Sequence, residues 1–98
     1  MKKSASFHPM AEMEMNEAAE YYETREIGLG TAFIDEVERV VKSIRQNPES
    51  SPIILKTVRS KILWRFPYSL MYSINPDAIL ILAVASQKRR PFYWRSRK

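Results

Sequence analysis

The chain has 98 residues, of which 45% are hydrophobic and 28% are charged, and it contains no cysteine. This composition predicts one globular domain over residues 1–98 and excludes a disulfide framework, a thiolate metal site and a thiol nucleophile. No apolar run approaches the ~20 residues of a membrane span, and no apolar stretch follows the lysines at the N-terminus as in a signal peptide. We therefore expect a cytoplasmic protein with no membrane partner.

The two halves of the chain carry opposite charge. Residues 1–50 hold six Lys/Arg and ten Asp/Glu, a balance of −4, whereas residues 51–98 hold ten Lys/Arg and one acid, a balance of +9. A strongly basic half-chain produces a positive field, whose natural partners are polyanions or an acidic protein. The alternative is that these charges only form the solvated surface of a small domain.

Residues 3–7 alternate weakly, which indicates a first strand, and His8-Pro9 then begins a helix because proline is tolerated in a first turn. His8 is the only histidine, and we expect it to support the helix start rather than to bind a metal or act in catalysis. Small and apolar residues share one face of this helix (Ala11, Met15, Ala18 and Tyr22), and glutamates take the opposite, solvated face (Glu12, Glu17, Glu20 and Glu23).

The stretch "GLGTAF" separates the first helix from a second one. Gly28 and Gly30 allow the chain to turn, and we expect Thr31 to cap the second helix. The helix carries a broad apolar stripe, which we expect to be buried against a sheet: Leu29, Phe33, Val37, Val40, Val41 and Ile44. "QNPESSP" ends it.

From Ile53 onward the segments "ILKTVR", "KILWRF", "LMYSI" and "ILILAVA" are rich in β-branched and aromatic residues, which predicts strands. Alternation in the second segment places Ile62, Trp64 and Phe66 on one side, and we expect Trp64 in the core. Residues 79–85 are apolar without interruption, as in a central strand. The predicted fold class is α+β in the order β-α-α-β-β-β, with a two-helix hairpin packed on one face of a mostly antiparallel four-stranded sheet.

The candidate functional residues are basic and aromatic and lie in the second half of the chain. They are Lys56, Arg59, Lys61 and Arg65, on or beside strands, and Arg89, Arg90, Tyr93 and Arg95, after the last strand. Lys61 and Arg65 share a strand face, and we expect a central last strand to bring Arg89 close to them. Several guanidinium groups on a concave sheet suit phosphate oxygens. No motif points to a metal or a cofactor.

The chain ends in "RRPFYWRSRK", and this tail is predicted to have two roles. Pro91 prevents the last strand from continuing, and Trp94 is expected to fold back and cover the edge of the sheet. Tyr93, between basic residues, is placed to stack on a base. The last charged residues, Arg95, Arg97 and Lys98, are expected to be mobile and to attract phosphates without specificity.

The stretches "AEYYETREIGLGTAFIDEVE", "NP", "VRSKILWRFPYSLMYSI" and "ILAVASQKRRPFYW" together resemble the RelE/ParE superfamily of small toxins from bacterial type II toxin–antitoxin (plasmid stabilisation) modules. The resemblance covers most of the chain, in order and at matching spacing. It implies the same β-α-α-β-β-β fold, and a cytoplasmic inhibitor of growth that a cognate acidic antitoxin keeps inactive. We expect an antitoxin helix in an apolar groove beside the two helices, and larger assemblies only with the antitoxin.

The resemblance leaves three functions open. RelE-like members cleave mRNA on the ribosome through the 2′-OH of the substrate, and this is our leading expectation. ParE-like members inhibit DNA gyrase and are not enzymes, and a third possibility is an inactive relic that only binds antitoxin. For cleavage, the resemblance implies that Arg59, Arg65 and Arg89 stabilise charge on phosphorus and that Tyr93 transfers a proton or stacks. Lys56, Lys61, Arg90 and Arg95 would bind the nucleic acid.

One position departs from the nuclease pattern. Many relatives carry a histidine directly after the last strand, where this chain has Ser86. A serine cannot shuttle protons near neutral pH as an imidazole does.

Overall fold

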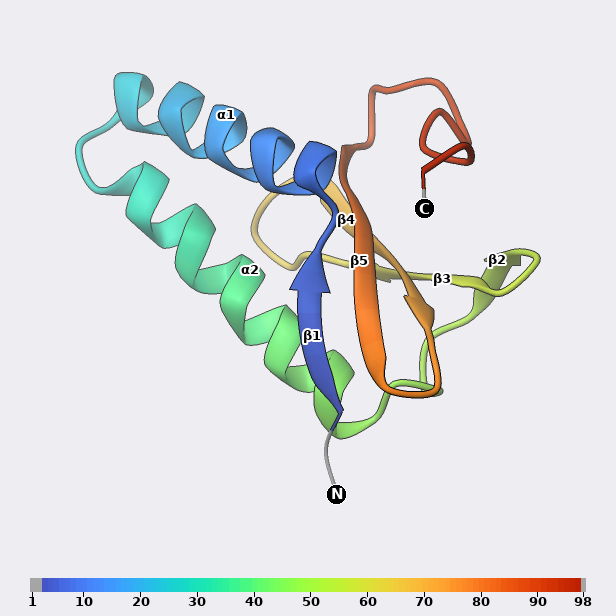
Figure 1. Cartoon of the computed structure of the whole chain (residues 1–98). Helices are drawn as coiled ribbons and strands as arrows, with labels where there is room; N and C mark the ends of the chain where they lie inside the picture. The colour runs from blue at the N-terminus through green and yellow to red at the C-terminus, as the bar shows by residue number, and fades with distance from the viewer. Residues whose placement is uncertain (1–2, 98) are drawn as a thin grey trace.

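Two helices cover one face of a five-stranded sheet in the computed structural model, which describes residues 3–97 (Figure 1). The elements are β1 (Ser4–Phe7), α1 (Pro9–Arg25), α2 (Leu29–Gln46), β2 (Ile53–Leu55), β3 (Val58–Ile62), β4 (Tyr68–Ile74) and β5 (Ala78–Ser86). The sheet order is β1-β5-β4-β3-β2, in which β1 is parallel to β5 and all other neighbours are antiparallel. The predicted α+β fold is confirmed, with β5 in the interior of the sheet.

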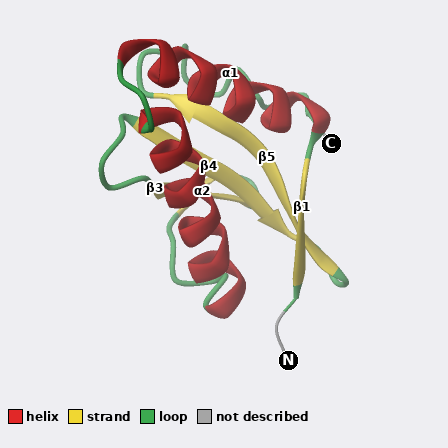
Figure 2. Cartoon of the chain, turned by 90° about the vertical axis from the view of Figure 1, so that its left-hand side faces the viewer, coloured by secondary structure: helices red, strands yellow, loops and turns green. Residues whose placement is uncertain are grey.

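The sheet has one strand more than predicted. Residues 53–62 form a tight hairpin of β2 and β3, and Lys56 in its turn has a φ of 53°, in the left-handed region. Figure 2 shows the two layers from the side of the helices: α2 lies in front of the sheet, and α1 crosses its upper end. The fifth strand adds a short edge to the predicted order without changing it.

Both helices begin at the residues that the turn chemistry favours, with one correction. His8 is the N-cap of α1, as expected, and its Nδ1 accepts a hydrogen bond from Met10 N at 3.0 Å. The N-cap of α2 is Gly28 (φ 89°), so the prediction that Thr31 caps this helix is wrong. The Glu23 carboxylate of α1 accepts the backbone N–H groups of Gly28 and Gly30 instead, each at 2.9 Å. The Glu23 side chain, although it belongs to the preceding helix, thus takes the role of an N-cap side chain for α2.

The close approach of the two helices depends on Gly30. A Cβ added there would lie 2.4 Å from the backbone oxygen of Ala19, closer than atoms can approach. The glycine therefore allows the predicted hairpin of α1 and α2 to close.

The apolar stripe of α2 packs on the sheet as predicted. Phe33, Val37 and Ile44 are fully buried, whereas Leu29, Val40 and Val41 of the same stripe are only partly buried against this core. The Phe33 ring lies 5.1 Å from the rings of Phe66 and Tyr68. The sheet contributes the other large side chains of this core: Leu70, Tyr72, Ile79, Ile81 and Val84. The main core therefore lies between the helices and the sheet.

The prediction that Trp64 belongs to the core is wrong, because β3 ends at Ile62 and the alternation of a strand does not continue. Leu63 and Phe66 are buried, whereas Trp64 is 93% exposed. The backbone N–H groups of Trp64 and Arg65 both bond to the carboxylate of Glu36 on α2, and this turns the Trp64 side chain outward.

A second, smaller core lies on the opposite face of the sheet. Met71 pairs with Ala83 and Tyr72 with Ile81, so Leu82 is an extra residue on β5, a β-bulge that reverses which residues face which side. Beyond it Val84 faces the helices, while Ala83 and Ala85 face the tail and contact the buried Trp94. The small alanines leave room for the indole, so Trp94 is packed as predicted, but on a face of the sheet and not over its edge.

Candidate functional site

The carboxylate of Glu14 is the centre of a polar network where α1, β5 and the C-terminal tail meet. Its side chain is only 11% exposed. It accepts hydrogen bonds from Val84 N (3.1 Å), from Tyr93 Oη (2.6 Å) and from both terminal nitrogens of Arg97 (2.9 and 3.0 Å). Charge-assisted and bidentate bonds of this kind are the strongest hydrogen bonds in proteins. One glutamate therefore ties three distant parts of the chain together.

The network occupies an open edge of β5. Strand β1 pairs with β5 only as far as Ile81, so the polar backbone groups beyond it lack a strand partner. Glu14 accepts the N–H of Val84, and Arg97 donates to the carbonyl of Leu82 at 3.1 Å. The Glu14–Arg97 ion pair thus satisfies groups that an exposed strand edge would leave unpaired.

Sequence reasoning missed Glu14, although a signal was present. Ala11 and Ala18 are both buried, and Glu14 lies three residues after the first and four before the second. Residues at this spacing share a helix face, so the pattern indicates a glutamate that points inward. The four glutamates that were predicted to be solvated, Glu12, Glu17, Glu20 and Glu23, are indeed exposed.

The expectation that Arg97 is mobile is wrong. Its guanidinium is as buried as the Glu14 carboxylate with which it pairs, and the hydrogen bond to Glu14 raises the pKa of Arg97. Arg95, by contrast, is exposed, and Lys98 lies outside the described residues. The tail is therefore held to the body of the protein by its penultimate residue.

Tyr93 is held in a fixed environment. Burial, followed by the hydrogen bond to Glu14, raises the pKa of the Tyr93 phenol well above its usual range. The guanidinium carbon of Arg89 lies 3.9 Å from the centre of the Tyr93 ring, and that of Arg97 lies 5.0 Å from it. The phenol therefore holds its proton more firmly than an ordinary tyrosine does, and Arg89 already occupies a position over its ring.

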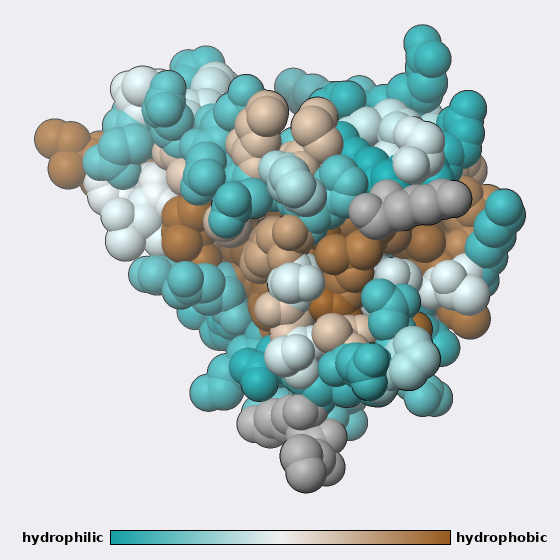
Figure 3. Space-filling view, viewed as in Figure 1, coloured by the Kyte–Doolittle hydropathy of each residue, from teal (hydrophilic) through white to brown (hydrophobic). Residues whose placement is uncertain are grey.

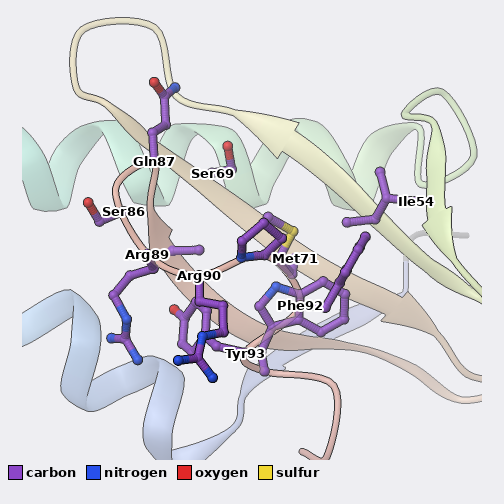
Figure 4. A pocket seen from close by; sticks show the side chains of 12 residues that line it. Ile54, Ser69, Met71, Ser86, Gln87, Arg89, Arg90, Phe92 and Tyr93 are labelled. Carbon is purple, nitrogen blue, oxygen red and sulfur yellow. The ribbon is translucent and has the colours of Figure 1, made fainter.

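Arg89 is the accessible cation beside this network. Its side chain is 53% exposed, and Nη1 lies 3.9 Å from Glu14 Oε2, a loose contact that contributes little to stability. Figure 4 shows the side chains of Arg89 and Arg90 extending from the same side of the tail, with Phe92 on the other side of the pocket toward Ile54. The tail thus exposes two adjacent guanidinium groups.

The other predicted basic residues do not join Arg89. Arg59 Nη1 donates to the carbonyls of Glu49 (3.0 Å) and Ser51 (2.7 Å), so it holds the connection between α2 and β2. Lys61 pairs with Leu70 of the main core and lies on the helix side of the sheet. The expected cluster of Arg89 with Lys61 and Arg65 does not form, because β4 separates β3 from β5 and the tail leaves on the opposite face.

Arg65 and Lys56 lie in turns. Arg65 is exposed on the β3–β4 loop, with its guanidinium carbon 5.6 Å from the centre of the Phe66 ring. Lys56 lies at the β2–β3 turn and lines one groove with Arg95 and Arg97, whose apolar wall includes Leu82. This groove, on the tail side of the sheet, combines positive charge with apolar surface.

A second groove lies beside the helices. Phe7, Met15 and Val41 form its apolar lining, and its charged lining is two basic residues, Lys42 and Arg45, and one acidic residue, Glu38. Figure 3 shows hydrophobic surface gathered in a band across the middle of the molecule, with hydrophilic surface above and below. An amphipathic acidic helix would match both properties of this groove.

Two further observations concern other kinds of site. Among residues 3–97, no group of three or more His, Cys, Asp or Glu side chains is arranged to hold a metal ion. In the same part of the chain, neither helix has the length and hydropathy needed to cross a membrane.

Comparisons with known proteins agree with this architecture. Residues 5–91 match the family model described as "ParE toxin of type II toxin-antitoxin system, parDE". A solved chain from the chromosomal ParDE toxin–antitoxin system of P. aeruginosa superimposes with a TM-score of 0.74 at 20% sequence identity, covering 87% of this chain and 96% of that one. At this identity the structural likeness shows the fold. A search of curated protein sequences returns no match.

Proposed function

Because the chain belongs to the family of ParE toxins of type II toxin–antitoxin systems, we propose that it stops growth by binding and inhibiting DNA gyrase, and that it does so without cleaving RNA. The sequence alone favoured mRNA cleavage. The hydrogen bond that the Tyr93 phenol donates to Glu14 is the observation that supports inhibition of gyrase instead.

Cleavage through a 2′-OH requires a group that accepts a proton near neutral pH. Tyr93 was the candidate, but a tyrosine is protonated near neutral pH, and here the phenol donates its hydrogen bond to Glu14 and its raised pKa makes the phenolate rarer still. Ser86, at the position where a histidine would serve, accepts a hydrogen bond from Lys88 N at 3.2 Å and forms part of a turn. Arginine stays protonated and cannot act as the base. The predicted residues therefore do not supply the acid–base pair of a nuclease.

A binding function makes better use of the same residues. Arg89 and Arg90 are exposed on a tail that the Glu14–Arg97 pair holds in place, so they can contact acidic groups of a protein at little cost in conformational freedom. Arginine is also enriched among the residues that dominate protein interfaces. We therefore assign Arg89 and Arg90 to the target-binding surface of this toxin.

The antitoxin partner that the family implies would use the two grooves. We propose that an acidic helix lies in the groove of Phe7, Met15 and Val41, where Lys42 and Arg45 pair with its carboxylates. An extended segment would then follow the groove lined by Lys56 and Arg95. Such a segment orders on binding, and the affinity of the complex should fall as salt rises.

Two assays on the same preparation test the choice of target. The toxin is titrated into gyrase supercoiling a relaxed plasmid, and in parallel into ribosomes translating a defined mRNA whose ends are mapped. We expect supercoiling to be inhibited and the mRNA to remain intact. Arg89→Ala should weaken inhibition, whereas Arg25→Ala, which removes the same charge from an exposed position at the end of α1, should not.

Three other outcomes would contradict the proposal in different ways. Ribosome-dependent cuts in the mRNA with no effect on supercoiling would restore the nuclease reading, with Arg89 and Arg90 on phosphate. No effect in either assay, together with tight antitoxin binding, would identify an inactive relic. Equal inhibition by wild type and Arg89→Ala would move the target-binding surface away from the tail.

A further inference from the structure

The β3–β4 loop carries an aromatic side chain that the fold does not use. Trp64 is 93% exposed, and Ile62, two residues earlier, is 66% exposed. Tryptophan buries about 150–250 Å² when it is covered, so leaving one in water forfeits a large hydrophobic contribution. The other tryptophan of the chain, Trp94, is buried, so the exposure of Trp64 is not a general property of its residue type here.

The loop that carries Trp64 is anchored on both sides. Leu63 and Phe66 are buried, and Leu63 N donates to Tyr68 O at 2.9 Å. Between them, the backbone N–H groups of Trp64 and Arg65 bond to Glu36, the latter at 2.8 Å. The backbone beneath Trp64 is therefore fixed while its side chain points out.

The anchor itself is unusual, because it is a buried carboxylate. Glu36 is 2% exposed in the middle of α2, and burying a charge is costly unless hydrogen bonds compensate it. One oxygen accepts the two loop N–H groups, while the other, Oε1, has no hydrogen-bond partner and lies 4.0 Å from Arg39 Nη2. An apolar residue at position 36 would fill the core without this cost, but it would not hold the loop.

Two exposed arginines, Arg65 and Arg39, lie near the loop that carries Trp64. Arg65 is exposed next to Trp64, and Arg39 is 66% exposed beside the buried Glu36, whose own charge does not project into solvent. A partner that receives Trp64 should therefore offer an apolar pocket edged by carboxylates. The exposed aliphatic side chain of Ile62 favours a protein over a nucleic acid, because it adds apolar area that a base or a phosphate cannot use.

We propose that Trp64 is an anchor residue that inserts into an apolar, carboxylate-edged pocket on the protein that this toxin inhibits, with Ile62 and Arg65 at the rim of the contact. This inference rests on the proposed function, in which that protein is DNA gyrase. A rigidly presented tryptophan flanked by arginine has the composition of an interface hot spot, and pre-organisation of its loop by Glu36 lowers the entropy lost on binding.

The test compares Trp64→Ala with Ile27→Ala, which removes an equally exposed (93%) apolar side chain from the turn between α1 and α2. We expect Trp64→Ala to raise the toxin concentration for half-inhibition of supercoiling by at least about 30-fold, the equivalent of a 2 kcal/mol hot spot. It should also abolish growth arrest. Its melting temperature and its affinity for the antitoxin should stay at wild-type values, and Ile27→Ala should match wild type in all assays.

Each alternative has its own result. Wild-type inhibition and growth arrest by Trp64→Ala overturn the proposal, as does a loss of antitoxin affinity, which would make the antitoxin the occupant. If wild type is a dimer that Trp64→Ala dissociates, the proposal is overturned and the occupant is a second copy of the chain. If Trp64→Ala loses only mRNA cleavage, the proposal is overturned and the occupant is a nucleic acid. If wild type leaves gyrase unaffected but Trp64→Ala still abolishes growth arrest without RNA cleavage, the gyrase proposal fails and the anchor role stands for another protein. A wild-type chain that arrests nothing overturns both.

Discussion

Replacing Glu14 with alanine should destabilise this protein more than any other change of a surface-accessible charge. The substitution removes four hydrogen bonds to one carboxylate and leaves Arg97, 11% exposed, without its counter-charge. Breaking a buried ion pair by deleting one partner costs about 3–5 kcal/mol. Because both side chains keep some contact with water, we expect about 3 kcal/mol, out of roughly 5–15 kcal/mol for a domain of this size.

Urea unfolding followed by circular dichroism and by tryptophan fluorescence measures this loss. For a domain of about 100 residues, 3 kcal/mol corresponds to a fall of roughly 12–24 °C in Tm. Trp64 is already exposed in the folded protein, so a change in tryptophan fluorescence should mainly report exposure of the buried Trp94. In Glu14→Ala this change should occur at lower urea than the helices unfold. Glu20→Ala, on the exposed face of the same helix, is the control and should stay within about 0.5 kcal/mol of wild type.

A double-mutant cycle decides whether the ion pair is responsible. If Glu14 acts through Arg97, the two alanine substitutions should couple by at least about 1 kcal/mol. Strictly additive effects, or a Glu14→Ala protein as stable as wild type, would refute the conclusion that this pair closes the edge of β5.

Three further changes test other parts of the structure. Phe33→Ala empties the centre of the helix–sheet core and should cost about 3–5 kcal/mol in urea unfolding; a protein that melts like the parent would place the stripe of α2 outside the core. The raised pKa of Tyr93 means that the folded state keeps a proton that the unfolded state loses above about pH 10, so stability should decline above that pH, and less steeply in Tyr93→Phe. The bonds from Gly28 N and then Gly30 N lower the pKa of Glu23, so its contribution is present above about pH 4 and is lost on further acidification. The difference in Tm between wild type and Glu23→Gln should therefore shrink as the pH falls through this range, and a constant difference would argue against the cap.

The sequence by itself determined the order of the elements and most of what lies inside. The stripe of Phe33, Val37 and Ile44, the uninterrupted run 79–85 and the aromatic Trp94 were all assigned correctly to buried surfaces. These assignments succeed because a helix or strand that buries one face repeats apolar residues at its own period, and that period is a local property of the chain. The role of His8 at a helix start was predictable for the same local reason.

Only the tertiary structure determined which charged side chains form contacts within the protein and which stay exposed. Glu14 meets Val84, Tyr93 and Arg97 across separations of 70, 79 and 83 residues, and Arg59 is used to hold the chain before β2. Some of the charged side chains that distinguish the two halves are therefore paired or hydrogen-bonded within the fold, and the composition does not show which ones. Periodicity shows that a side chain is buried, but not which distant group it meets.

The fate of Trp64 depended on a similar long-range contact. Alternation along "KILWRF" placed it inside, but the strand ends at Ile62, and Glu36, 28 residues before Trp64, binds the backbone of the following loop. The pattern of six residues contains no information about a carboxylate on α2 that binds their backbone. The residue that local reasoning assigned to the core is thus the most exposed aromatic of the protein, and only packing between α2 and the sheet put it there.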